Sequence, residues 1–143
     1  MSIIIDKSIL ISDNQSMMNF NKIAKHENIF ISTITISELL IVVQMAKTQE
    51  IKTRRSNFVQ YIINSISLLP FDEDVVKIYS TILSESFTNK LNISYVNLII
   101  AATSIKFGYP LLTFNKTNFE RIPNLRIISA IDLIDSSKFV KTN

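Results

Sequence analysis

Oxygen-bearing side chains stand in this sequence where predicted strands end. Asp6 directly follows the apolar run at 3–5, and Thr113 closes a second apolar run at 111–113. Open α/β sheets place their functional sites at the carboxyl ends of the strands. If these two runs form neighbouring strands, they bring together polar residues from across the chain, namely Asp6, Glu38, Asn97, Thr113, Asn115 and Asn118.

Oxygen atoms gathered in this way are the ligands that a hard cation such as Mg²⁺ or Mn²⁺ requires. Such a cation can activate water and neutralise charge at a phosphodiester. The chain has no cysteine, one histidine and one glycine. Those counts exclude cysteine nucleophiles, multi-histidine metal sites within one chain, and glycine-rich phosphate loops. Any metal must therefore be held by oxygen.

Short apolar runs alternate with helical patterns, which predicts a parallel sheet with helices on its faces. Strands are predicted at 3–5, 29–31, 68–71, 111–113 and 125–128. Helices are predicted over 15–25, from a cap at Thr33 or Thr35 through Ala46, around 58–66, from Asp72 to about Phe87, and over 95–107. The β-branched content of 31–43 leaves a longer strand open there. Pro70 favours an edge position for its strand.

The helix over 95–107 is apolar on most sides and has clear signals at both ends. Ser94 is a good N-cap, and Gly108 stands where a left-handed residue would end the helix. Pro110 prevents any continuation. We therefore expect a buried helix that leads directly into the strand at 111–113.

The composition is that of a globular chain. Its 143 residues are 47% hydrophobic and 19% charged, with a formal net charge of +3. This predicts one domain over 1–143 with a substantial core. No run reaches the length of a spanning helix, and the N-terminus lacks the features of a secretory signal. We expect a cytoplasmic protein with no membrane association. The modest positive charge is compatible with a polyanionic partner but does not identify one.

Four cationic residues follow the second predicted helix in a polar stretch. They are Lys47, Lys52, Arg54 and Arg55. In this interpretation they form a basic junction between two antiparallel helices. They can contact RNA phosphates or an acidic stretch of a protein partner, or they can form an ordinary solvated face.

Five short motifs, in order along nearly the whole chain, resemble those of the PIN-domain family, and of the VapC-like toxin ribonucleases in particular. They are Asp6-Lys7-Ser8 with its apolar continuation, Thr35-Ile36-Ser37-Glu38-Leu39, Leu69-Pro70-Phe71-Asp72, Asn97-Leu98-Ile99-Ile100-Ala101-Ala102, and Leu112-Thr113-Phe114-Asn115 with Asn118-Phe119. The resemblance implies a three-layer α/β/α fold around a central, mostly parallel sheet of four or five strands. It also implies endoribonuclease activity dependent on Mg²⁺ or Mn²⁺, frequent homodimers, and often a small antitoxin partner.

The resemblance assigns roles to the candidate residues. The catalytic set is Asp6, Glu38, Asn97 and Asn118, of which Asp6, Glu38 and Asn97 would hold the metal. The residues that orient the site or the substrate are Ser8, Thr113 and Asn115. The basic residues at 47, 52, 54 and 55 would contact RNA or a partner.

Asn97 and Asn118 depart from the family pattern, which has aspartates at these two positions. Asparagine keeps the shape and one carbonyl oxygen but loses the negative charge. Metal affinity and activity should then be weaker than in the full pattern. A catalytically silent module that binds RNA or a protein partner is the alternative. A third interpretation is that both asparagines were engineered to disable a toxic enzyme.

Each candidate also has a purely structural interpretation. Asp6 can cap a helix, and Glu38 can form an ion pair with a nearby lysine. Asn97 stands where a capping box places the reciprocal partner of Ser94, and Asn118 can be a turn residue. His26 is expected to be exposed and inert, and the Met17-Met18 pair is expected to lie in the core.

Overall fold

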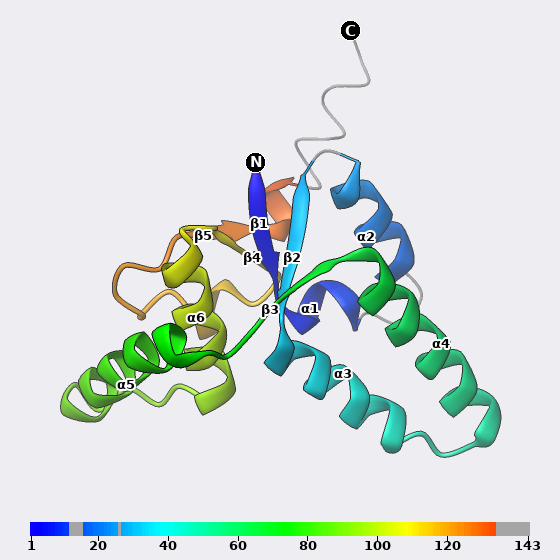
Figure 1. Ribbon diagram of the computed structural model, residues 1–143, viewed down its shortest axis with the longest axis horizontal. Coiled ribbons are helices and arrows are strands. Elements are labelled where there is room, and N and C mark those ends of the chain that lie inside the picture. Colours follow the sequence, from blue (N-terminus) through cyan, green and yellow to red (C-terminus); the bar gives the residue numbers. More distant parts are fainter. Residues whose placement is uncertain (12–15, 26, 134–143) are drawn as a thin grey trace, which may run out of the picture.

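The computed structural model describes residues 1–11, 16–25 and 27–133, with the backbone alone for 16–19. The predictions for His26, for the side chains of Met17 and Met18, and for the end of the chain fall outside these residues. Figure 1 shows a central sheet with helices on both sides. Within the described ranges no helix is long and apolar enough to cross a membrane.

The sheet has five strands, all parallel, in the order β3-β2-β1-β4-β5. The strands are β1 (Ser2–Ile5), β2 (Asn28–Ser32), β3 (Ser67–Leu69), β4 (Leu111–Thr113) and β5 (Ile127–Ser129). β1 lies in the centre between β2 and β4, so the expectation that the first and fourth strands are neighbours is confirmed. β3 is an edge strand, as Pro70 indicated.

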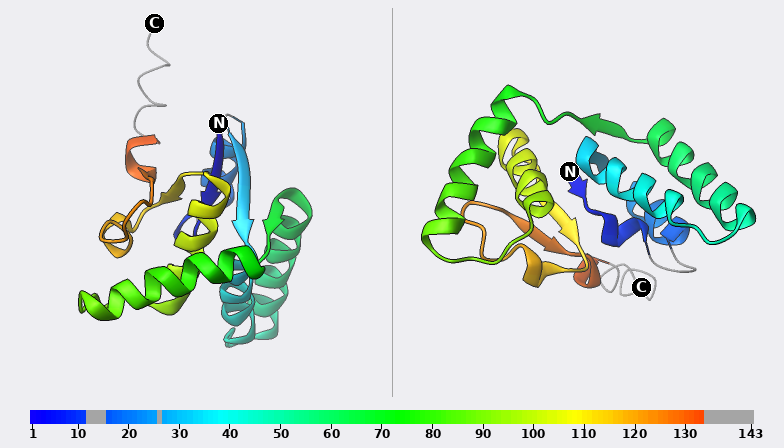
Figure 2. Two further views of the ribbon diagram at one scale, coloured as in Figure 1. Left: turned by 60° about the vertical axis from the view of Figure 1, so that its left-hand side comes forward. Right: turned by 90° about the horizontal axis from the view of Figure 1, so that it is seen from below.

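The helices divide into two layers. They are α1 (Lys7–Leu10), α2 (Ser16–Ala24), α3 (Thr33–Gln44), α4 (Gln49–Ser65), α5 (Glu73–Thr88) and α6 (Tyr95–Phe107), with a 3-10 turn η1 (Lys116–Asn118). Seen from below, α3 and α4 lie on one side of the molecule and α5 and α6 on the other (Figure 2). The predicted three-layer α/β/α architecture is confirmed, with five strands and a fully parallel sheet.

Alternation along β1 explains the two layers. Ile3 and Ile5 belong to a buried cluster that includes residues of α1 to α4, while Ile4 belongs to a second cluster with residues of α5 and α6. Leu111 and Leu112 of β4 divide between the two clusters in the same way. Successive side chains of a strand point to opposite faces, so a continuous apolar run is what a strand covered on both sides requires.

Two helix boundaries differ from the prediction. Ser32 is the N-cap of α3 and accepts a hydrogen bond from Ile34 N, in place of Thr33 or Thr35. The chain turns directly from β2 into the helix, so no longer strand forms over 31–43. α4 begins at Gln49, where Thr48 Oγ1 accepts from Ile51 N. The prediction of a basic junction between two helices is wrong for three of its four residues, because Lys52, Arg54 and Arg55 lie within α4.

Candidate metal-binding site

Asp6 lies at the carboxyl end of the central strand, where its carboxylate is held from both sides. Its Oδ1 accepts hydrogen bonds from Ser8 N at 3.2 Å and from Ser8 Oγ at 2.5 Å. Its Oδ2 accepts from Thr113 Oγ1 at 2.9 Å. Asp6 also caps the short helix α1, so the structural interpretation and the site interpretation describe the same contacts. Only 4% of the residue is exposed.

Ser8 and Thr113 join the loops that follow β1 and β4. Phe114 N donates to Ser8 Oγ at 3.0 Å, and Asn115 N donates to Thr113 Oγ1 at 2.9 Å. The register of the sheet makes this junction, because Ile5, the last residue of β1, pairs with Leu112, and β4 ends one residue later at Thr113. Asn115 thus takes part through its backbone, while its side chain is exposed.

Burial raises the pKa of Asp6 above its ordinary value of 3.8. The hydrogen bonds from Ser8 and Thr113 favour the charged form and oppose this shift, and the nearby negative charge of Glu38 adds to it. A desolvated carboxylate beside a second carboxylate gains from a cation that neutralises both.

Glu38 lies on α3 and reaches the same edge of the sheet. Its Oε2 forms an ion pair with Lys7 Nζ at 2.6 Å. Its Oε1 is buried and accepts no hydrogen bond from any residue that the structure describes. The predicted alternative for Glu38, an ion pair with a lysine, is therefore present. The partner, Lys7, follows Asp6 directly in the sequence and was not predicted to belong to the site.

Thr35 is a second residue near this edge for which the sequence predicted no role in the site. It is fully buried on α3, one turn before Glu38, and its Oγ1 has no hydrogen-bond partner among the residues described. Its place in the motif that contains Glu38 was the available signal. The side-chain oxygens of residues 35 and 38 are thus two buried acceptors on one helix, separated by three positions.

Asn97 and Asn118 are not joined to this cluster by any hydrogen bond among the described residues. Asn97 is half-buried in the first turn of α6, and its N–H donates to Ser94 Oγ at 3.2 Å. This is one half of a capping box. Asn118 ends the exposed turn η1, and its N–H donates to Asn115 O at 3.0 Å. The structure brings Asp6, Ser8, Glu38 and Thr113 together, and leaves the two asparagines without a bond to them.

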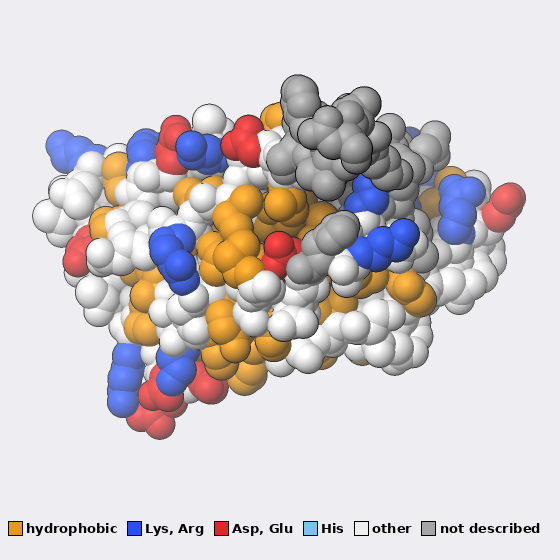
Figure 3. Space-filling view, turned by 90° about the horizontal axis from the view of Figure 1, so that it is seen from above, with side chains coloured by type: hydrophobic (Ala, Val, Ile, Leu, Met, Phe, Trp, Pro, Cys, Tyr) orange, Lys and Arg blue, Asp and Glu red, His pale blue; other side chains and the backbone are white. Residues whose placement is uncertain are grey.

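The basic residues predicted to contact RNA or a partner have different surroundings. Lys47 and Arg54 are exposed, and Lys52 is half-buried. Arg55 Nη1 donates to Val42 O at 2.9 Å, which ties α4 to α3. Figure 3 shows the side of the molecule on which β1 begins, where Lys and Arg side chains surround a central apolar area.

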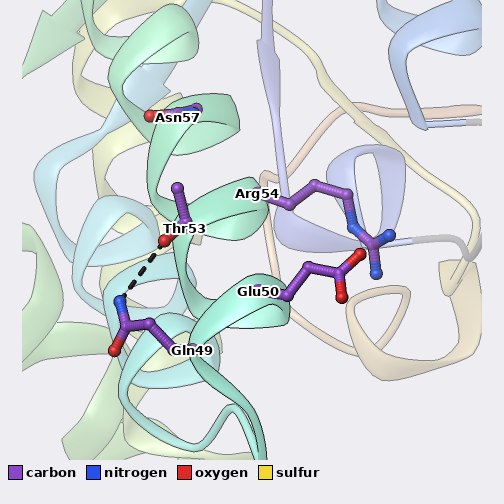
Figure 4. A pocket seen from close by; sticks show the side chains of 5 residues that line it. All are labelled: Gln49, Glu50, Thr53, Arg54 and Asn57. Atoms are coloured by element: carbon purple, nitrogen blue, oxygen red, sulfur yellow. Dashed lines mark hydrogen bonds between the residues drawn. The ribbon is translucent and has the colours of Figure 1, made fainter.

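A pocket of about 490 Å³ lies along the first half of α4. It is lined by Gln49, Glu50, Thr53, Arg54 and Asn57. Figure 4 shows the hydrogen bond of 3.3 Å from Gln49 Nε2 to Thr53 Oγ1, and shows Glu50 and Arg54 extending together to one side of the helix. No residue of the Asp6 cluster lines this pocket.

The donor set suits a divalent cation only in part. Among the described residues, no three Asp, Glu, His or Cys side chains gather closely enough to hold a metal. Two carboxylates, Asp6 and Glu38, lie near each other, and the Oε1 atom of Glu38 is a buried oxygen without a partner. An amide oxygen or a substrate oxygen, with several waters, would have to complete the shell of Mg²⁺ or Mn²⁺. The residues present therefore fit a divalent cation that is bound by a pair of carboxylates.

The five-stranded parallel sheet, with Asp6 and Glu38 near the ends of its strands, agrees with the class of protein that the sequence comparison identifies. The chain belongs to the PIN domain family, whose pattern matches residues 3–125. The predicted family is confirmed.

Within that family the chain is similar to the VapC proteins. It is 30% identical over 129 residues to Ribonuclease VapC of Rickettsia bellii (strain RML369-C), a match that covers 90% of this chain and 96% of that protein. The fold is also that of VapBC2 from Rickettsia felis bound to a promoter DNA fragment, with a TM-score of 0.75, 24% identity, and coverage of 90% and 98%. DNA-bound VapBC from Salmonella typhimurium gives a TM-score of 0.76 at 21% identity, with coverage of 91% and 98%.

Proposed function

We propose that this protein is a divalent-metal-dependent endoribonuclease of the VapC type and the toxin of a toxin–antitoxin pair. The observation that carries the proposal is the buried carboxylate of Asp6 at the carboxyl end of β1, held by Ser8 and Thr113 and facing the charge of Glu38. The relative in Rickettsia bellii, which matches along 90% of this chain, is a ribonuclease by name.

In this proposal Asp6, Glu38 and Asn97 hold the cation, and Asn118 frames the site. Bound Mg²⁺ or Mn²⁺ would supply charge neutralisation at the phosphodiester and activation of water. Ser8 and Thr113 fix the orientation of Asp6 through hydrogen bonds to separate carboxylate oxygens. Asn115 fixes Thr113 in turn through its N–H. The unpartnered Oε1 of Glu38 is an acceptor that can position the attacking water.

Asn97 and Asn118 attenuate the activity in this proposal. Replacement of two aspartates leaves about two negative charges where the family pattern has four. At roughly 4 Å and an effective dielectric constant near 20, each attraction between a carboxylate and a divalent cation is on the order of 8 kcal/mol, twice the value for two unit charges, before desolvation and repulsion are deducted. Four crowded carboxylates also repel one another, which offsets part of that difference. Metal binding should therefore be weak but measurable.

The proposed partners are single-stranded RNA, a small antitoxin and a second copy of the chain. The exposed cations Lys47 and Arg54 and the half-buried Lys52 are candidates for contact with RNA phosphates or with acidic residues of the antitoxin. Several structural neighbours are VapBC complexes, which supports the search for an antitoxin.

A catalytically silent module that binds RNA or a protein partner is the second candidate. The specific observation in its favour is that Glu38 already has a cationic partner in Lys7, and that Asn97 makes its described bond with the helix cap. Tight binding of Mn²⁺ by the unmodified protein would argue strongly against this candidate.

The test is cleavage of single-stranded RNA with and without Mn²⁺ or Mg²⁺. We expect slow cleavage that is abolished by EDTA and by Asp6→Ala, and that rises in Asn97→Asp and Asn118→Asp, because each restores a negative charge. Asp74→Ala is the matched control, since Asp74 forms an exposed ion pair with Lys106 and is not one of the proposed site residues. Full activity in Asp6→Ala would rule this site out. The sequence of the encoding gene will show whether the asparagines are natural.

A further inference from the structure

The ion pair between Lys7 and Glu38 differs from the exposed pairs of the structure. The side chain of Glu38 is 12% exposed and that of Lys7 is 48% exposed. By contrast, both partners of the Lys77–Glu73 pair on α5 are mostly exposed, and their charged atoms lie 3.3 Å apart. The Lys7–Glu38 pair joins α1 to α3 directly beside Asp6. An ammonium group therefore occupies one oxygen of a largely buried carboxylate that the proposed function assigns to a metal.

The other carboxylate of the site, that of Asp6, is held by neutral donors and not by the lysine. Both oxygens of Asp6 already accept hydrogen bonds from Ser8 and Thr113. The second oxygen of Glu38 has no hydrogen-bond donor within the described part of the chain. With Lys7 on Glu38, the cluster of Asp6, Lys7 and Glu38 carries one net negative charge when both carboxylates are ionised, and without Lys7 it carries two.

We propose that Lys7 is an internal counter-ion that competes with the divalent cation for Glu38. This inference rests on the proposed function, because it takes Glu38 as a metal ligand. The partly exposed stem of Lys7 lets the ammonium leave for solvent, and the cation can then use both charges of the site. The protein consequently needs a higher concentration of divalent cation to fill the site than it would need without Lys7.

Calorimetric titration of chelator-treated protein with Mn²⁺ tests this competition. Lys7→Met keeps most of the length of the side chain, which is one atom shorter, and removes the charge. We expect it to bind Mn²⁺ on the order of five- to tenfold more tightly than the unmodified protein, the equivalent of about 1 to 1.4 kcal/mol. The gain in thermal midpoint on adding Mn²⁺ should also be larger in Lys7→Met. Lys7→Gln repeats the measurement with a polar, neutral side chain and guards against a folding defect of the first variant.

Two controls make the result specific. Lys77→Met removes the same charge from the exposed pair with Glu73, and its affinity for Mn²⁺ should equal that of the unmodified protein. In a Glu38→Gln background, Lys7→Met should no longer increase the affinity, because the contested carboxylate is absent.

Equal or weaker Mn²⁺ binding by both Lys7 variants would overturn the competition and leave the proposed ribonuclease untouched. So would an equal gain in Lys77→Met, or a gain that persists with Glu38→Gln. If neither the unmodified protein nor the Lys7 variants bind Mn²⁺, competition is overturned as well. The RNA cleavage assay then decides separately whether the proposed function fails with it.

Discussion

At the scale of single residues, the carboxylate of Asp6 is the group on which both structure and proposed chemistry depend. It accepts three hydrogen bonds, two from Ser8 and one from Thr113, and is 4% exposed. These bonds fix its direction, but they do not fully replace the water that burial removes, since the pKa is still raised. Such a carboxylate is oriented in advance and short of counter-charge, which are the conditions under which it gains from a cation.

The raised pKa of Asp6 gives stability a defined pH dependence. The folded protein binds this proton more tightly than the unfolded chain, so stability falls as pH rises from about 3.8 through the raised pKa. We predict that Asp6→Asn is more stable than the unmodified protein at neutral pH, by about 1.4 kcal/mol for each unit by which the pKa is raised. The difference should disappear below pH 3.8. Thermal unfolding in metal-free buffers across this range measures it.

Asp74→Asn is the matched control for that measurement, with the opposite sign. A hydrogen bond from Lys106 lowers the pKa of the exposed Asp74, so its substitution should reduce stability slightly at neutral pH and have no effect at acid pH. Parallel pH curves for Asp6→Asn and the unmodified protein would contradict the assignment of Asp6 as a desolvated acid.

At the scale of elements, α6 connects Asn97, in its first turn, to β4, the strand that carries Thr113. Ser94 caps it through Asn97 N, and Gly108 ends it in the left-handed conformation with φ of 68°. Between these residues the helix is buried over Leu98–Ser104, and it leads through Pro110 into β4 and Thr113. The length of the helix therefore sets where Asn97 lies relative to the strand that supplies Thr113. The predicted caps at both ends are confirmed.

The C-terminal cap of α6 provides a clean stability test. A Cβ at Gly108 would meet no atom within 4 Å, so any cost of Gly108→Ala comes from the backbone conformation alone. We expect Gly108→Ala to lower the free energy of unfolding by about 1–2 kcal/mol. Gly108→Asn should lower it by less, because asparagine tolerates the left-handed region better. Urea unfolding of the three proteins measures the order. Equal stability of Gly108→Ala and the unmodified protein would contradict a conformational role for this glycine.

At the scale of the whole molecule, the sheet supports two hydrophobic clusters through alternate side chains of the same strands. Ile4 and Leu111 serve the cluster with α5 and α6, while Ile5 and Leu112 serve the cluster on the opposite face. The proposed site lies at the edge shared by both layers, with Glu38 on α3, Asn97 on α6, and Asp6 and Thr113 at the ends of adjacent strands. Loosening either layer should disturb the ends of β1 and β4 together.

Ile4→Ala tests that dependence. Ile4 is fully buried, and the substitution should lower the free energy of unfolding by roughly 2–5 kcal/mol. Ile41→Ala is the control, because Ile41 is 55% exposed on α3, and its effect should stay within about 0.5 kcal/mol. Urea unfolding measures both, and Ile4→Val is the milder variant should Ile4→Ala fail to fold. A small loss in Ile4→Ala would mean that the second cluster contributes little to stability.

The sequence by itself determined the local features of this protein. Uninterrupted isoleucines at 3–5 predicted a strand covered on both faces, and Ser94, Gly108 and Asp72 marked helix ends that the structure confirms. These signals are local because caps and burial patterns depend on neighbours in the sequence. The same signals failed where tertiary contacts decided: α3 begins at Thr33 and is capped by Ser32, the last residue of β2, and α4 extends over the polar residues from 49 that lack a strong apolar pattern.

Only the tertiary structure decided which oxygen atoms meet. Asp6 and Thr113 are 107 positions apart, and their hydrogen bond exists because β1 and β4 are adjacent and in register. The pairing of Lys7 with Glu38 follows from the position of α3 beside α1, which no sequence spacing encodes. Motifs indicated which residue types would be used. Strand order and helix packing determined their distances, because those depend on contacts between segments far apart in the chain.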